Sequence, residues 1–234
     1  MAAKTDTQKT NTDLTINTRL SGFIQNNRKA FLIGLIAVVV IIIGFVIVNT
    51  VRGKILSNAL SQVDTFERRY NEIKPHIGSN EPESLLKLVE LAILSEELNT
   101  FAQKTTGFAA ARIYGINANI FADQKRWAEA EEAWSKAAQA AAKSYLAPFS
   151  IFNAAVAAEE QGNIDSAISY YTRALNYGDL FPSAARAQFS VGRLEESRNN
   201  KDAALEAYRN LLSKWPNDPV WPNLAQNRIL ILAN

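Results

Sequence analysis

The 234-residue sequence contains no cysteine, and histidine and methionine occur once each. The lack of cysteine excludes disulfides, thiolate catalysis, cysteine-based metal sites and a lipidated N-terminal cysteine. The single histidine, His76, lies between Pro75 and Ile77, where a helix is expected to end. No orienting partner can be named for it, so a solvated loop histidine is a simpler interpretation than a general base.

Catalytic and cofactor-binding motifs are also absent. The sequence has no GxGxxG, P-loop, HExxH or GxSxG pattern. Acidic pairs such as Glu96-Glu97 and Glu159-Glu160 are interpreted as solvating charges on exposed helical faces. The sequence has no sustained alternation of apolar and polar residues with a period of two, so no strands are predicted. We therefore expect an all-α, non-enzymatic protein without a cofactor.

Charge is unevenly distributed along the chain. Residues 1–29 carry five basic and two acidic residues, whereas the rest carries 20 basic and 21 acidic residues. A nearly neutral body argues against nucleic-acid binding. Residues 1–29 are rich in Thr, Asn, Lys and Gln and lack aromatic residues before Phe23, which predicts a disordered tail.

One long apolar run divides the chain. It covers residues 30–51, from its first residue Ala30 to its last residue Val51, and contains no charge. A helix of 22 residues is about 33 Å long, enough for a hydrocarbon core of about 30 Å. An uncleaved transmembrane helix is the prediction, and a cleaved signal sequence is the alternative.

The charges beside the run give its orientation. Arg19, Arg28 and Lys29 precede it, and Arg52 and Lys54 follow it. This bias is small, but it predicts a cytoplasmic N-terminus with the remaining domain across the membrane.

Two helices are expected between the span and the first repeat. Residues 52–77 form an amphipathic juxtamembrane helix, either continuous with the span or hinged at Gly53. A second helix covers residues 83–104, after a turn-forming linker that ends at Pro82. Its helical spacing predicts burial of Leu85, Leu88, Val89, Ala92, Leu98 and Ala102.

The remaining sequence repeats with a period of 37 residues. Ala130, Ala167 and Ala204 recur at this spacing, each followed four residues later by an aromatic residue (Trp134, Tyr171 and Tyr208). Small residues stand 12 positions upstream of each alanine: Ala118, Ala155 and Gly192. This pattern resembles the tetratricopeptide repeat, a helical hairpin of about 34 residues. The resemblance implies a solenoid domain over residues 83–234, with repeats at about 111–147, 148–184 and 185–218 and a capping helix at 222–233.

In such solenoids the first helix of each repeat lines a concave surface that binds partners. The predicted partner-binding groove comprises Arg112, Asn119, Phe152, Asn153, Val156, Arg186, Phe189 and Arg193. We expect Phe152, Phe189 and Arg193 to point away from the packing positions, and the alternative is that Phe152 or Phe189 belongs to the core. A mixture of Arg, Asn and Phe suits extended peptide-like segments.

Some groove positions also match the carboxylate clamp of co-chaperone tetratricopeptide domains. Asn119, Asn153 and Arg186 coincide with three of its five positions. The other two are Gly115 and Ser190, which cannot supply the remaining positive charges. A general peptide-binding groove is therefore favoured over a true clamp.

The layout as a whole resembles the YfgM-like family. The tail ends in Phe-Ile-Gln-Asn-Asn-Arg-Lys-Ala at residues 23–30 and is followed by a single span, an amphipathic helix and tetratricopeptide repeats. The resemblance implies an accessory of the Sec translocon in the bacterial inner membrane with a periplasmic repeat domain. Its partners would be translocon subunits, a periplasmic chaperone or exported polypeptides.

The C-terminal stretch supports a competing interpretation. Residues 208–230 look more like envelope-assembly repeat proteins of the outer-membrane and Tol-Pal type. That similarity implies a structural scaffold with one fixed partner. A cytosol-facing receptor of the organelle-import kind is a third alternative.

Overall fold

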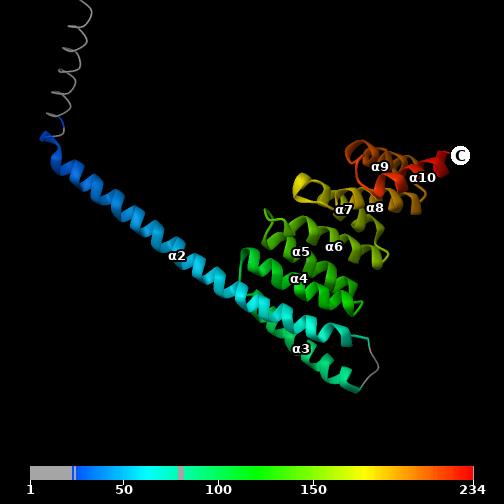
Figure 1. Ribbon diagram of the computed structural model, residues 1–234, viewed down its shortest axis with the longest axis horizontal. Coiled ribbons are helices and arrows are strands. Elements are labelled where there is room, and N and C mark those ends of the chain that lie inside the picture. Colours follow the sequence, from blue (N-terminus) through cyan, green and yellow to red (C-terminus); the bar gives the residue numbers. More distant parts are fainter. Residues whose placement is uncertain (1–22, 24, 79–81, 234) are drawn as a thin grey trace, which may run out of the picture. The chain divides into compact units, whose positions relative to one another are not determined.

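The computed structural model describes residue 23, residues 25–78 and residues 82–233 (Figure 1). Within these ranges the chain is helical and has no strand, which confirms the predicted all-α fold class. The disorder predicted for the tail falls largely outside the described residues. The chain forms two compact units, one up to Ser57 and one from Asn58.

The first unit consists mainly of the N-terminal part of α2, which spans Arg28–Ile73. Its apolar residues are exposed, and α2 continues as a helix through Gly53. By length and composition it is the one helix among the described residues that could cross a membrane.

The second unit begins with a small core between helices. It contains the last part of α2, α3 (Pro82–Ala102) and α4 (Gly107–Asp123). Val63, Phe66, Tyr70 and Ile73 are buried, as the amphipathic pattern predicts. The short 3-10 helix η1 (Lys74–His76) follows α2, because Pro75 cannot donate a backbone hydrogen bond.

The side of α3 that faces this core differs from the prediction. Leu91, Leu94, Leu98 and Ala102 are buried there. Four residues expected in the core, Leu85, Leu88, Val89 and Ala92, are exposed instead. The prediction is confirmed for Leu98 and Ala102 and wrong for the other four residues, because α3 has apolar residues on both sides and helical spacing alone does not say which side packs.

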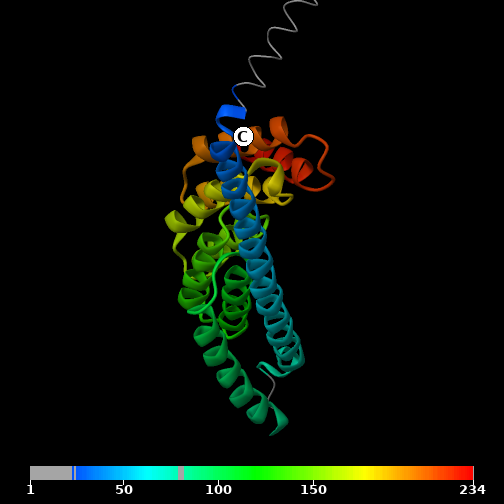
Figure 2. The same cartoon turned by 90° about the vertical axis from the view of Figure 1, so that its left-hand side faces the viewer.

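The remaining helices form successive hairpins. The first helices are α4, α6 (Leu146–Glu160) and α8 (Ala184–Ser197), and the second helices are α5 (Trp127–Ala140), α7 (Ile164–Leu175) and α9 (Lys201–Lys214). A 3-10 turn η2 (Gly178–Leu180) precedes α8, and α10 (Trp221–Ala233) packs on α9. Both views show them in chain order, from α3 at one end of the second unit to α10 at the other (Figures 1 and 2).

The turn within each hairpin has the same geometry. Lys125, Gly162 and Asn199 stand 37 residues apart and have positive φ angles of 58°, 75° and 61°. In each turn the next backbone N–H bonds to the carbonyl five residues earlier, at 2.8 to 2.9 Å. This is the Schellman arrangement that ends a helix with a left-handed residue. The turn fixes where the second helix of each hairpin begins. The backbone N–H groups of Ala130, Ala167 and Ala204 then donate to the carbonyl oxygens of Arg126, Asn163 and Asn200.

Small residues control how closely the helices of a hairpin approach. Ala130, Ala167 and Ala204, which recur at the 37-residue period, are 0% exposed and lie at packing positions. Ala118 and Ala155 are also fully buried. At Gly192 the constraint is tighter, because a Cβ atom would lie 2.5 Å from the ring of Tyr208.

We predict that Gly192→Ala destabilises the protein by about 1 to 3 kcal/mol, because the Tyr208 ring would have to move within a packed core. Thermal unfolding of the full chain in detergent, followed by circular dichroism, measures this loss. Gly115→Ala is the matched control, since its Cβ would meet the Trp134 ring at 3.4 Å. Equal melting temperatures for the two variants would contradict the close approach.

Candidate functional site

The first helices α4, α6 and α8 carry the eight residues of the predicted groove. The contacts described below bring together residues from α6 and α8. Arg112 on α4 belongs to a different environment.

Arg112 faces the end of α2. Its guanidinium donates to Asp64 at 2.7 Å and to Glu67. Burial acts to lower the pKa of Arg112, but these two carboxylates raise it overall. Arg112 is therefore neutralised within the fold, and the expectation of a free cationic groove residue at this position was wrong.

Phe152 lies inside the core. It is only 6% exposed and packs edge-on against Tyr171, with ring centroids 5.2 Å apart. The guanidinium of Arg186 lies 5.1 Å from its ring centroid and covers it on the solvent side. Phe152 therefore belongs to the core, as the alternative held, because the first helix also supplies a large side chain to the packing within its own repeat.

Phe189 is half-buried and occupies the equivalent position one repeat later. It stacks against Tyr208 at 5.4 Å and against Trp221 of α10 at 5.3 Å. Beside it is a hollow of about 400 Å³ lined by Phe189, Arg193, Glu196, Ser197, Tyr208 and Arg228. Two residues of the predicted groove, Phe189 and Arg193, thus border a real depression on α8.

A carboxylate between two repeats binds Arg193. Glu159 of α6 accepts hydrogen bonds from Arg193 at 2.6 and 2.7 Å, and its other contact is the hydroxyl of Tyr171 at 3.2 Å. Burial, reinforced by Glu159, raises the pKa of Tyr171 well above its ordinary value, so the hydroxyl stays protonated and donates. Glu159 thereby links the two helices of one repeat to the next repeat.

The same arrangement recurs one repeat later. Glu196 of α8 accepts from the hydroxyl of Tyr208 at 3.1 Å and pairs with Arg228 of α10. Glu159 and Glu196 are separated by the 37-residue period, as are the two tyrosines. We call each set of tyrosine, glutamate and arginine a repeat-linking triad. Glu159 is thus part of the packing rather than a solvating charge, and its coincidence with the repeat period was the signal that could have revealed it.

The equivalent positions one period before the first triad are apolar. They hold Ala122, Trp134 and Val156 in place of glutamate, tyrosine and arginine. Val156, a predicted groove residue, packs partly buried against the core of the second repeat. The groove therefore changes from apolar to ion-paired character along the array.

Asn119 and Asn153 complete the predicted set. Both are partly exposed, and within the described part of the chain neither side chain makes a hydrogen bond. Their amide groups are free to bind a ligand backbone. Among the described residues, no cluster of three acidic or histidine side chains could hold a metal ion.

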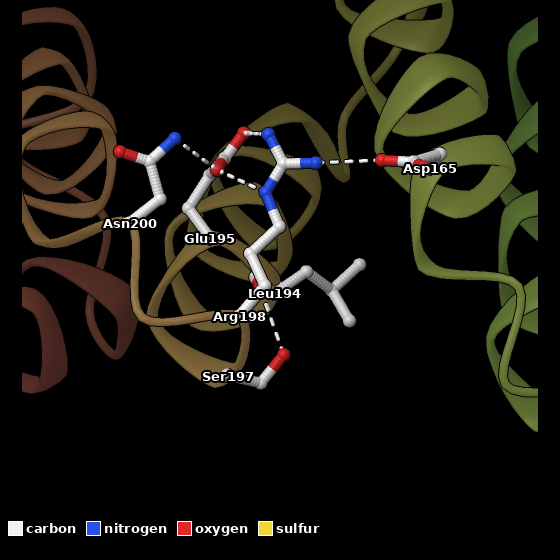
Figure 3. A network of polar contacts seen from close by, with 6 residues as sticks. All are labelled: Asp165, Leu194, Glu195, Ser197, Arg198 and Asn200. Carbon is white, nitrogen blue, oxygen red and sulfur yellow. Dashed lines mark hydrogen bonds and ion pairs between the residues drawn. The ribbon is translucent and has the colours of Figure 1, made fainter.

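A second polar network joins repeats near the turn after α8 (Figure 3). The guanidinium of Arg198 bonds to Glu195 at 2.7 Å and to Asp165 of α7 at 2.6 Å. The side-chain amide of Asn200 donates to Glu195 at 3.0 Å. Glu195 is 7% exposed, and these partners satisfy it. The network therefore stabilises the junction between the repeats, and the carboxylate of Glu195 is occupied by these contacts.

We predict that Glu159→Gln destabilises the full chain by about 0.5 to 1 kcal/mol, because it removes a partly exposed ion pair while keeping an acceptor for Tyr171. The loss should shrink at high salt, as measured by thermal unfolding. Its neighbour Glu160 is exposed and unpaired among the described residues, so Glu160→Gln is the control. Equal stability of both variants would mean that Glu159 does not link the repeats.

Part of the second unit matches a known repeat family. Residues 152–219 match the tetratricopeptide repeat family. A tetratricopeptide repeat-containing protein of Treponema pallidum (strain Nichols) is 37% identical over 127 residues, which cover 54% of this chain. The match spans about half (52%) of that relative's length.

A crystal structure of BtubC (BKLC) from P. vanneervenii is 17% identical and has a TM-score of 0.44. The match covers 70% of this chain and 76% of that chain. The family match therefore identifies tetratricopeptide repeats in residues 152–219, and repeats of this type generally mediate contacts between proteins.

Proposed function

We propose that this chain is a membrane-anchored, non-enzymatic binding protein whose repeats capture a polypeptide partner. The observation that carries the proposal is the exposed apolar segment of α2 in a chain whose second unit is a repeat array. The segment is long, uncharged and apolar, so a hydrocarbon environment is its natural surrounding. We place the anchor at residues 30–51.

The proposed site of action is the Sec translocon at the periplasmic side of a bacterial inner membrane. The YfgM-like arrangement of tail, span and repeats supports this assignment, as does the similarity to a protein of a bacterium. The partners would be a periplasmic chaperone, a translocon subunit or an exported polypeptide. Free amides at Asn119 and Asn153 and the half-buried ring of Phe189 suit an extended backbone with apolar side chains.

A structural scaffold in a cell-envelope complex is the second candidate. It is favoured by the ion pairs of Arg112 and Arg193, which leave fewer charges available for adaptable binding. A surface whose side chains are already fixed suits one complementary partner. A chaperone-like groove should bind many unfolded peptides weakly, whereas a scaffold should bind one protein tightly.

The charge bias predicts that the N-terminus is cytoplasmic and that everything after Val51 lies across the membrane. Protease added to spheroplasts should digest the repeat array and spare an epitope at the N-terminus. Disruption of the membrane should then expose that epitope. Protection of the array in intact spheroplasts would reverse the proposed orientation.

The groove is tested with two arginines that each lie over an aromatic ring. Arg186, on the first helix α8, covers the ring of Phe152 on α6. Arg173, on the second helix α7, covers the ring of Tyr170 on the same helix. We predict that Arg186→Ala weakens partner capture by about 1 to 2 kcal/mol, whereas Arg173→Ala leaves it unchanged.

Capture is measured in intact membranes with a photo-reactive residue in place of Asn153, and the same residue in place of the exposed Thr172 is the positional control. Crosslinks to many exported chains support the chaperone-like function, and a single product supports the scaffold. Equal crosslinking from both positions would exclude this groove as the binding surface.

A further inference from the structure

The outward side of α3 is an apolar surface that no described residue of the second unit covers. Leu85, Leu86, Val89 and Ile93 are 69%, 74%, 60% and 53% exposed, and we call these four residues the α3 outer face. The opposite side of α3 is fully buried in the core. A helix that is apolar on both sides usually has both sides covered.

The position of α3 makes this surface unusual. Helix α3 lies at one end of the second unit (Figures 1 and 2). End units of a repeat array normally present a polar outer surface, because no further repeat covers them. The α3 outer face instead has the apolar character of a surface between two packed helices.

A groove extends this face toward α2. It has a volume of about 500 Å³ and is lined by Gln62, Phe66, Ile93, Glu96, Glu97, Thr100, Phe101 and Lys104. Ile93 belongs to both the groove and the α3 outer face, so the two surfaces are continuous. A groove between two helices beside an apolar stripe has the geometry that accepts a third helix.

The charges around this surface are mostly paired. Lys87 pairs with Glu90 at 3.1 Å, and Arg69 pairs with Glu97. Within the described ranges, Glu96 and Lys104 at the groove have no side-chain partner. The surface therefore offers apolar contact, one free carboxylate and, eight residues further along the sequence, one free ammonium group.

These charges argue against a lipid surface or a second copy as the occupant. Interfacial helices bind anionic lipids through several Lys and Arg residues. Within α3 the only lysine is Lys87, and it is paired with Glu90. In a two-fold dimer, Glu96 of each copy could pair with Lys104 of the other copy. The two-fold axis would then pass near Thr100. Such a contact would leave Leu85 and Leu86 uncovered.

We propose that the α3 outer face and its groove bind an amphipathic helix of a partner protein. The partner helix carries apolar residues at i, i+3 and i+7, a Lys or Arg that faces Glu96, and a carboxylate that faces Lys104. This surface is separate from the residues on α6 and α8, so its failure would leave the proposed groove untouched.

The test uses the full chain in phosphatidylcholine nanodiscs and two fluorescent, stapled helical peptides. Both peptides carry leucine at i, i+3 and i+7, and they differ only in having Lys or Glu at the position that would meet Glu96. Fluorescence anisotropy should show about tenfold tighter binding of the Lys peptide. Glu96→Lys should reverse this preference.

Val89→Glu should weaken both peptides by at least about tenfold, because it places a charge in the centre of the apolar stripe. Ile231→Glu is the matched control, since Ile231 is 59% exposed on α10 at the other end of the unit. Circular dichroism verifies that both variants stay folded. Absence of peptide binding, an unchanged preference in Glu96→Lys, or equal effects of the two glutamate substitutions would overturn the proposal.

A photo-reactive residue in place of Leu86 distinguishes the other occupants. With the Lys peptide present, crosslinking to the peptide is the expected result. Predominant crosslinking to lipid, or to a second copy of the chain, would overturn the proposal in favour of that occupant.

Discussion

The close contact between Gly192 on α8 and the ring of Tyr208 on α9 sets how near the two helices of the third repeat can approach. Gly192 lies so close to the Tyr208 ring that no Cβ atom fits between them. With the two helices at this distance, Asn199 in the left-handed conformation closes the turn between them. The second helix then begins so that Ala204 is buried. The other two repeats have alanine at the equivalent positions, Ala118 and Ala155, so a small buried residue recurs there with the 37-residue period.

The aromatic rings also decide what remains available for binding. Phe152 and Phe189 lie on first helices, yet both pack against a tyrosine of the second helix. Arg112 and Arg193 likewise bind carboxylates of neighbouring helices. The surface of the first helices thus offers amides, ring edges and the guanidinium of Arg186 rather than a broad positive field.

The repeats were predictable from sequence because the same physical constraint appears three times at one spacing. Chance agreement of Ala130, Ala167 and Ala204 with their aromatic partners is improbable. The side of α3 that packs was not predictable, because it occurs once and both sides are apolar. Glu159 was misjudged for a related reason: an acidic pair resembles a solvated surface until the partner, 34 residues away, is known.

The repeat-linking triads bear on how the chain avoids misassembly. Repeat proteins can fold with hairpins docked in the wrong order, since all their hairpins are alike. Here the joint before the second repeat has Ala122 and Val156 where the next joint has Glu159 and Arg193. If the third repeat docked on the first, Arg193 would meet Ala122 and lose its carboxylate. The first junction is therefore apolar and the two later junctions are ionic, and this difference disfavours docking of the third repeat directly on the first.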